Sequence, residues 1–440
     1  MFPRRFIAAI LTIGTLASAA MAQTHTIQDT AKRGDTNFYD ITLTVKGELR
    51  VQKDGKNASI PLAANARLQF SERVLELHQN LPNKVARHYE LAKSRLAIDG
   101  QIIEKALRDD RKLTIAQRHN DQFLCYSPAG PMLREELEVA SEHFDTLAIT
   151  GMLPEQTVKV GDTWKIPNQV AQSLCQFEGL LTNDLTGKLD EVKDGFADIT
   201  IRGKTQGIEL GAMCKLEVTA KVRYELLPKR IVSLEWTQKD ERDQGPVSPA
   251  SSIETTTVVQ RRVIAQPKEL TDAALESVPK GFEPPLALTL VYQSDAKQRF
   301  DVALTREWRM VAQTENHLVF RLLERGDLVA QVALTAWTKA DAGKHLSADE
   351  FKQVIAETPG WQIEEILEAS EVPVENGRWL YRIVARGAME EVKVVQNFYL
   401  LAAPSGEQLV ATFTMKPNQV AKLGTRDLTL LGAIGFQPKK

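Results

Sequence analysis

Apolar side chains occupy every second position from Leu216 to Leu226, and polar or charged side chains occupy the positions between them. A period of two places successive side chains on opposite faces of an extended backbone, so this pattern predicts a strand with one buried and one exposed face. Eleven residues at roughly 3.4 Å each give a strand of about 37 Å. Such a long strand predicts a strongly twisted or curved sheet.

The same alternation recurs on both sides of this stretch. It predicts further strands at 39–45, 181–192, 196–208, 230–241 and 253–264, and the segment Lys53–Lys56 is typical of a hairpin turn. Strands joined by short turns form an antiparallel meander that packs one face on a core. Residues 84–98 fit a helix or a strand equally well.

One helix is predicted to cover this sheet. Leu133, Leu137, Ala140, Phe144 and Leu147 recur at the spacing that lines one helical face. A proline precedes the pattern, glutamates fill its first turn, and a glycine and a second proline follow it. These residue types favour the start and the end of a helix respectively.

Four prolines in Gln266–Pro285 predict a linker between two domains. Residues 36–265 form the predicted β-rich domain. Residues 286–440 mix strands with two helices, one beginning at the capping box Ser347–Glu350 and one spanning 418–431. The predicted fold class is therefore α+β, with a curved antiparallel meander and its covering helix followed by an α+β module.

Residues 1–22 have the features of a signal peptide. Two arginines precede an uncharged apolar stretch, and small residues lie at its end. This arrangement predicts cleavage between Ala22 and Gln23 and export to the periplasm or the extracellular space. Residues 23–35 are polar and are predicted to form a flexible leader. No later stretch is long and apolar enough to span a bilayer, so no transmembrane segment is predicted in the mature chain.

Charge and cysteine content narrow the range of partners. The formal net charge is −2, which offers no electrostatic case for nucleic-acid binding, because such binding needs concentrated positive charge. The three cysteines, Cys125, Cys175 and Cys214, leave at least one thiol unpaired in a monomer. If a disulfide forms, it is predicted to join Cys175 and Cys214, which both lie beside the meander. The alternative is three buried structural thiols.

The sequence contains no motif of a known catalytic or metal site. G-x-S-x-G, H-E-x-x-H, Walker A and G-x-G-x-x-G patterns are absent, and no two histidines have the spacing of a local metal clamp. His119 and Cys125 form no recognisable catalytic pair, and Asp109 and Asp110 fit a solvated turn. The sequence therefore predicts no catalytic, cofactor-binding or metal-binding residue.

Two parts of the chain resemble known families. The C-terminal part resembles the PsbP-like family over about 286–436, which implies an α/β/α fold and a binding or assembly role without a fixed catalytic set. The segments that carry this resemblance are Phe300–Leu304, Trp308, Trp337, Ser347–Ile355, Gly360–Trp361 and Ile434–Phe436.

The N-terminal part is similar to uncharacterised secreted β-rich bacterial proteins, through Leu153-Pro154 and the segment Val158–Trp164. Long amphipathic strands under a covering helix are also similar in architecture to periplasmic lipoprotein carriers of the LolA type. Neither resemblance assigns an activity to this chain, because one fold supports many functions.

These observations favour an exported binding or assembly module without catalysis, whose partner is an unknown protein. One alternative is a carrier that holds a hydrophobic ligand under the curved sheet, and another is an enzyme with an unrecognised site. A carrier requires an apolar cavity of several hundred Å³, whereas a binding module requires an exposed apolar patch.

Overall fold

The computed structural model of the chain describes residues 23–53, 56–78, 81–119, 122–140, 144–389 and 391–437. Strands contain 57% of the residues and helices contain 13%, so the fold is mainly β. It has less helix than the predicted α+β class implies. The predicted signal peptide, residues 1–22, lies outside the described residues, and cleavage between Ala22 and Gln23 stays a prediction.

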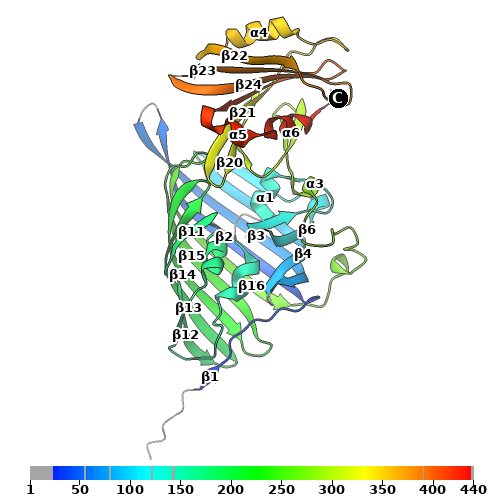
Figure 1. Cartoon of the computed structure of the whole chain (residues 1–440). Helices are drawn as coiled ribbons and strands as arrows, with labels where there is room; N and C mark the ends of the chain where they lie inside the picture. The colour runs from blue at the N-terminus through cyan, green and yellow to red at the C-terminus, as the bar shows by residue number, and fades with distance from the viewer. Residues whose placement is uncertain are drawn as a thin grey trace, which may run out of the picture.

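A curved antiparallel sheet of thirteen strands dominates the structure (Figure 1). Its strands are β2 (Thr36–Lys53), β3 (Lys56–His78), β4 (Leu81–Ile98), β5 (Gln101–Ala106), β6 (Leu113–His119), β7 (Gln122–Tyr126), β10 (Thr163–Lys165), β11 (Gly179–Asn183), β12 (Thr186–Lys193), β13 (Phe196–Glu209), β14 (Ala212–Glu225), β15 (Arg230–Arg242) and β16 (Ala250–Val263). The order is β10-β12-β13-β14-β15-β16-β2-β3-β4-β6-β7, with β11 beside β13 and β5 beside β4. The predicted meander is therefore present, and β16 joins its two halves by pairing with β2.

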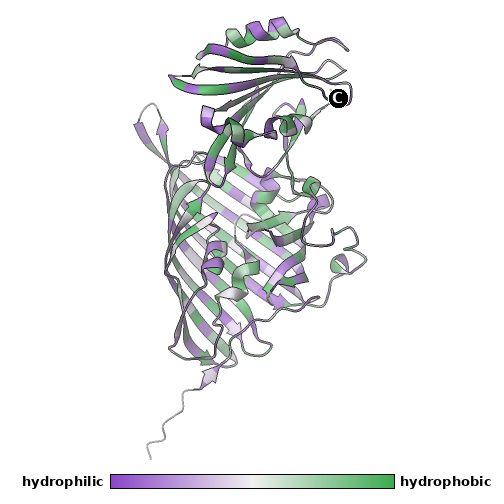
Figure 2. Ribbon diagram, in the orientation of Figure 1, coloured by the Kyte–Doolittle hydropathy of each residue, from purple (hydrophilic) through white to green (hydrophobic). Residues whose placement is uncertain are grey.

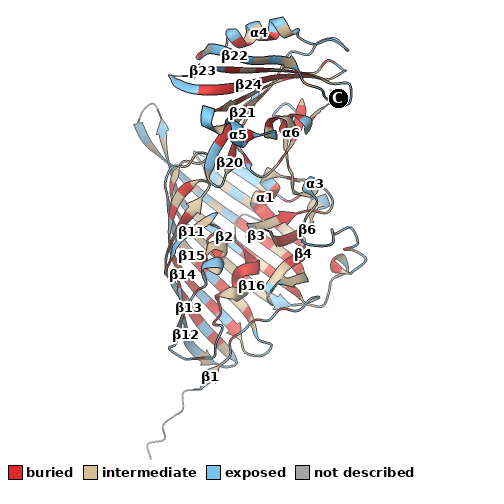
Figure 3. Cartoon of the chain, viewed as in Figure 1, coloured by how far each residue is buried: buried red, intermediate tan, exposed pale blue. Residues whose placement is uncertain are grey.

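The alternation that predicted the central strand is confirmed in β14. Its inward positions, such as Leu216 and Tyr224, are buried, and the intervening positions, such as Glu217 and Lys221, are exposed. Figures 2 and 3 show the same alternation of hydropathy and burial along the neighbouring strands. The ambiguous residues 84–98 form part of strand β4.

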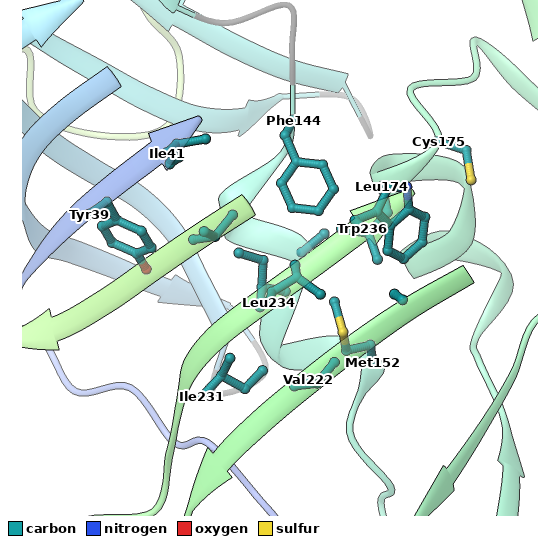
Figure 4. Packing of buried hydrophobic residues seen from close by; sticks show 14 of the residues in the cluster. Tyr39, Ile41, Phe144, Met152, Leu174, Cys175, Val222, Ile231, Leu234 and Trp236 are labelled. Atoms are coloured by element: carbon teal, nitrogen blue, oxygen red, sulfur yellow. The ribbon is translucent and has the colours of Figure 1, made fainter. Parts of the chain in front are cut away.

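Three short helical segments cover the concave face of this sheet. They are α1 (Arg134–Ala140), the 3₁₀ helix η2 (Thr146–Met152) and α2 (Asn168–Leu174). Phe144, Met152 and Leu174 belong to the same buried cluster as Leu234 and Trp236 of β15 (Figure 4). The rings of Phe144 and Trp236 lie 5.8 Å apart.

The covering helix is shorter than the predicted span 133–147. The side chain of Asp145 accepts a hydrogen bond from the backbone N–H of Leu147 and thereby begins the separate helix η2. Leu137 and Leu147 are nevertheless both buried, as the periodicity predicted. The apolar pattern thus identified the buried face, while a local side-chain cap determined where the helical geometry changes.

Residues 23–35, expected to form a flexible leader, pack against the domain in the structure. Strand β1 (Thr24–His25) pairs with β9 (Val158–Lys159), and Ile27 is fully buried. The Asp29 carboxylate accepts a hydrogen bond from Arg261 at 2.6 Å. One apolar anchor and one buried ion pair therefore hold a segment whose polar composition alone indicated mobility.

The segment predicted as a linker, Gln266–Pro285, is also anchored. It contains the short helix η3 (Lys268–Leu270), and the Leu270 side chain is fully buried. The Lys84 ammonium donates to the carbonyl oxygens of Pro279 and Gly281 at 2.6 and 2.7 Å. These backbone contacts leave no periodic signal in the sequence.

The C-terminal module contains a seven-stranded antiparallel sheet. In spatial order its strands are β19 (Trp308–Gln313), β20 (His317–Glu324), β21 (Asp327–Ala336), β25 (Gln408–Met415), β24 (Val392–Ala402), β23 (Trp379–Met389) and β22 (Trp361–Glu371). Helix α4 (Ala348–Ala356) packs on one face, and α5 (Val420–Leu423) and α6 (Arg426–Gly432) pack on the other. The sheet thus has helices on both faces.

Local signals determine where these helices begin and end. The predicted capping box is confirmed, with Ser347 accepting from the Glu350 N–H and Glu350 accepting from the Ser347 N–H. The predicted closing helix over 418–431 is divided into η4 (Pro417–Gln419), α5 and α6, because Gly424 adopts a φ of +58° between the last two. Glycine occupies this region without steric cost.

A small mixed sheet joins the two parts of the chain. Its order is β26 (Ile434–Phe436), β18 (Phe300–Leu304), β17 (Val291–Ser294) and β8 (Met132–Leu133), and β8 runs parallel to β17. The remaining short helices are η1 (Asp109–Arg111) and α3 (Leu286–Thr289). The C-terminal module therefore lies against one end of the large sheet (Figure 1).

Candidate functional site

A cleft of about 340 Å³ lies between the large sheet and the C-terminal module. The sheet domain contributes residues from β6, β7, α1, α2 and β13, and the C-terminal module contributes two arginines. The lining residues are Arg118, His119, Phe123, Leu124, Arg134, Leu137, Asp145, Gln172, Ser173, Gln176, Phe177, Glu178, Glu209, Leu210, Arg306 and Arg309. Apolar and charged side chains thus meet in one concavity, as in many ligand sites.

Arg118 organises one wall of the cleft. Its guanidinium donates to the buried Asp145 carboxylate and, at 2.8 Å, to the Ser173 hydroxyl. Burial raises the pKa of Asp145, and the charge of Arg118 counteracts part of this increase. The Ser173 hydroxyl donates to the Gln169 carbonyl at 2.8 Å. Its proton therefore points to the backbone and not to a general base.

A second buried ion pair lies behind this wall. The Arg87 guanidinium donates to Glu72 at 2.9 Å and to the Thr146 hydroxyl at 2.6 Å, and both charged side chains are at most 3% exposed. Arg87 also lies over the rings of Phe70 and Phe123 at 4.9 and 5.4 Å. Because Thr146 begins η2, this ion pair connects the sheet interior to the segment that forms the wall.

The opposite side of the cleft comes from the C-terminal module. Arg306 donates from Nε to the Thr289 carbonyl at 2.9 Å and from Nη2 to the carbonyl of Cys125 in β7. Arg321 of β20 likewise donates to the Pro246 carbonyl. The contacts to Cys125 and Pro246 fix the module against backbone atoms of the sheet domain and so set the shape of the cleft.

Three polar side chains gather at the edge of the cleft that Glu209 lines. The Cys214 thiol donates to Asp240 Oδ1 at 2.9 Å, and Arg242 Nη1 donates to Glu209 Oε1 at 3.2 Å. Burial raises the pKa of all three acidic groups, Glu209, Cys214 and Asp240. Residues from three adjacent strands therefore form one protonatable cluster.

The predicted disulfide is not formed in the structure. Cys125, Cys175 and Cys214 are all free and buried. Cys214 is engaged with Asp240, and Cys175 is the C-cap of α2. Burial, with a smaller contribution from Asp240, also raises the pKa of the Cys175 thiol.

The cluster of Glu209, Cys214 and Asp240 is missed by motif reasoning because its members are far apart in the sequence. The alternation of inward and outward side chains along β15 contains the signal that would have revealed the cluster. Leu234 and Trp236 point inward on β15, so Asp240 and Arg242 belong to the same face. A polar residue on the buried face of a predicted strand is an exception that needs a partner. Asp109 and Asp110, by contrast, are both exposed in η1, in agreement with the predicted solvated turn.

Comparison with known proteins gives distant structural similarity over about a third of the chain. No family model and no curated protein matches. Cyanobacterial PsbP (CyanoP) from Synechocystis sp. PCC 6803 is 15% identical, with 36% of this chain and 98% of that chain covered and a TM-score of 0.27. PA94 from Pseudomonas aeruginosa, a protein of unknown function and putative regulator, is 12% identical, with coverages of 34% and 99% and a TM-score of 0.23.

A Bacteroides thetaiotaomicron protein is also 12% identical, with 34% of this chain and 48% of that chain covered and a TM-score of 0.25. These TM-scores carry no functional argument. Within the described part of the chain, no helix has the length and apolar character needed to span a membrane.

Proposed function

We propose that this chain is an exported, non-catalytic binding or assembly module, and that a segment of its partner enters the cleft between the sheet domain and the C-terminal module. The observation that carries this proposal is the composition of the cleft, which takes its lining from both parts of the chain. Binding sites occur preferentially at such junctions.

The chemistry of the lining favours a segment with an apolar side chain beside a carboxylate. Phe123 and Leu124 are partly exposed and supply apolar contact area, and the lining has four arginines against three carboxylates. Asp145 and Glu209 are each already engaged by an arginine, Arg118 and Arg242 respectively. Counted formally with His119 neutral, the lining carries a charge of +1, which favours an incoming carboxylate.

A carrier of a hydrophobic ligand is less well supported because the chain fills the space such a ligand would need. Phe144, Met152 and Leu174 occupy the concave face and pack in one cluster with Trp236 (Figure 4). Admitting a lipid would require these buried side chains to leave the sheet. Ser173, the serine that lines the cleft, is not placed as a nucleophile, because its proton is directed to a backbone carbonyl.

Site-specific photocrosslinking in cells that produce the protein tests the proposal. A photoreactive residue replaces Gln172, which lines the cleft, or Glu217, which lies on the exposed face of β14. We expect the position in the cleft to capture a defined partner peptide and the control position not to capture it. That peptide, once synthesised, should bind the full chain.

A variant that blocks the cleft provides a second test of the proposal. Gln172→Trp should weaken binding of the peptide by about tenfold or more, a loss of about 1.4 kcal/mol, while Glu217→Trp should leave it unchanged. Equal crosslinking at both positions, or full affinity in Gln172→Trp, would contradict the cleft as the site. A co-purifying lipid in native mass spectrometry would instead support the carrier.

A further inference from the structure

Three side chains with metal-binding atoms converge at the end of the concave face. Glu209 lies on β13, Cys214 on β14 and Asp240 on β15, and their ligand atoms all lie within 4.8 Å of one another. Cys214 is buried and the two carboxylates are half-buried. No other group of this kind was found among the described residues. It combines a thiol with two carboxylates, which distinguishes it from an exposed acidic patch.

Strand register produces this convergence. Gly207 pairs with Cys214, and Cys214 pairs with Arg242 on the other side. Asp240 lies two residues before Arg242, and Glu209 lies two residues after Gly207, so all four side chains share the concave face. The rigid sheet therefore holds the three ligands in place, as a preorganised metal site requires.

We propose that Glu209, Cys214 and Asp240 bind a divalent cation of the zinc class. With the thiol ionised, the three ligands carry a charge of −3. A divalent cation and the adjacent Arg242 guanidinium together supply +3, so the occupied site is neutral. Without a cation, Arg242 pairs with Glu209, and the Cys214 thiol donates its proton to the half-buried Asp240 carboxylate.

The ligand set selects the metal. Thiolate favours zinc-like ions over magnesium or calcium, and carboxylates complete a borderline-soft site. Tetrahedral bonds of about 2.0 and 2.3 Å place ligand atoms about 3.5 Å apart. Cys214 Sγ and Asp240 Oδ1, which lie 2.9 Å apart, would therefore move apart by about 0.6 Å on metal binding.

The cleft offers a route of entry, because Glu209 lines it. Metal binding forms the Sγ–metal bond, breaks the S–H bond of Cys214 and releases the proton to solvent. No electron is transferred. Water takes the fourth position. The inference goes beyond the proposed function, because cation binding is measured without any partner.

Cobalt(II) and zinc(II) titration of the reduced full chain tests the site. We expect one equivalent of zinc in equilibrium dialysis and a thiolate-to-cobalt charge-transfer band with cobalt. Cys214→Ser should abolish the band, and Asp240→Asn should lower zinc affinity by about tenfold or more. Cys125→Ser, which removes a buried thiol in another strand, is the matched control and should bind as the wild type does.

Circular dichroism without metal establishes that each variant is folded. If Cys214→Ser is unfolded, Glu209→Gln is measured in its place and should lower zinc affinity to the same extent as Asp240→Asn. Absence of binding at micromolar zinc, or binding that persists unchanged in the folded variants, would overturn the proposal. Since these readouts need no partner, their failure leaves the crosslinking test of the cleft unaffected.

Discussion

Replacing Arg87 by methionine removes the cation from a buried ion pair while keeping most of the side-chain volume. In the wild type the Arg87 guanidinium donates to Glu72 at 2.9 Å, and the two side chains are 2% and 3% exposed. Methionine preserves apolar contact with Phe70 and Phe123 but makes no charged hydrogen bond. The Glu72 carboxylate is then left in the sheet interior without its counter-ion.

The loss of unfolding free energy depends on whether the Glu72 carboxylate stays ionised or takes up a proton. Removing one partner of a buried ion pair costs about 3–5 kcal/mol, because the remaining charge is uncompensated. Taking up a proton is the way to avoid that charge, and protonating an ordinary glutamate at pH 7 costs about 3.7 kcal/mol. Both routes predict that Arg87→Met loses about 4 kcal/mol of unfolding free energy at pH 7. At pH 5 protonation costs only about 1 kcal/mol, so the deficit should shrink.

Urea unfolding at pH 7 and pH 5 measures this difference. Arg95→Met is the matched control, because Arg95 and Glu104 form an exposed pair at 3.7 Å. Exposed pairs contribute about 0–1 kcal/mol, so the control should change little at either pH. The double variant Glu72→Gln, Arg87→Met carries no charge at the site and should lose the dependence on pH. An Arg87→Met deficit below about 1 kcal/mol at pH 7, or one equally large at pH 5, would refute the reasoning.

Three further predictions concern other named contacts. Lys84→Met removes two hydrogen bonds to residues 279–281, and trypsin should then cleave this segment faster than in the wild type. Ser347→Ala removes the cap of α4 and should lower the unfolding free energy of the C-terminal module by about 1 kcal/mol in urea. Burial alone would raise the pKa of Glu136, but hydrogen bonds from Arg108 and from two backbone amides outweigh it and lower this pKa. The stabilisation by Glu136 is therefore present above the ordinary carboxyl range and lost as pH falls through the folded pKa, so Glu136→Gln should be less stable than the wild type at pH 7 and similar to it at low pH.

Sequence periodicity was sufficient for most of the large sheet. Alternation predicted β14 within four residues, because each inward position of that strand is apolar. It does not reveal the environment of Arg261 in the predicted strand 253–264, whose side chain is only 9% exposed and pairs with Asp29. A charged residue is buried only when a distant partner compensates it, and a single sequence does not reveal that partner.

The same limitation explains why composition did not reveal that residues 23–35 and 266–285 are anchored to the rest of the fold. Polar and proline-rich composition predicted mobility, whereas Ile27 and Leu270 are fully buried and Lys84 holds two carbonyl oxygens. A few specific anchors outweigh the average composition of a short segment. The composition of a segment does not show which of its backbone atoms accept hydrogen bonds from a lysine far away in the sequence.

The cleft illustrates why the candidate site lies beyond sequence reasoning. Its shape depends on contacts in which a side chain of the C-terminal module meets a backbone carbonyl of the sheet domain, from Arg306 to Cys125 and from Arg321 to Pro246. Any residue can supply a carbonyl, so neither acceptor has a recognisable sequence signature. Since β8 also pairs with β17, movement of one module would change the cleft and the pairing together. A partner segment that fills the cleft would therefore stabilise the docked arrangement of both modules, which couples binding to the geometry of the whole chain.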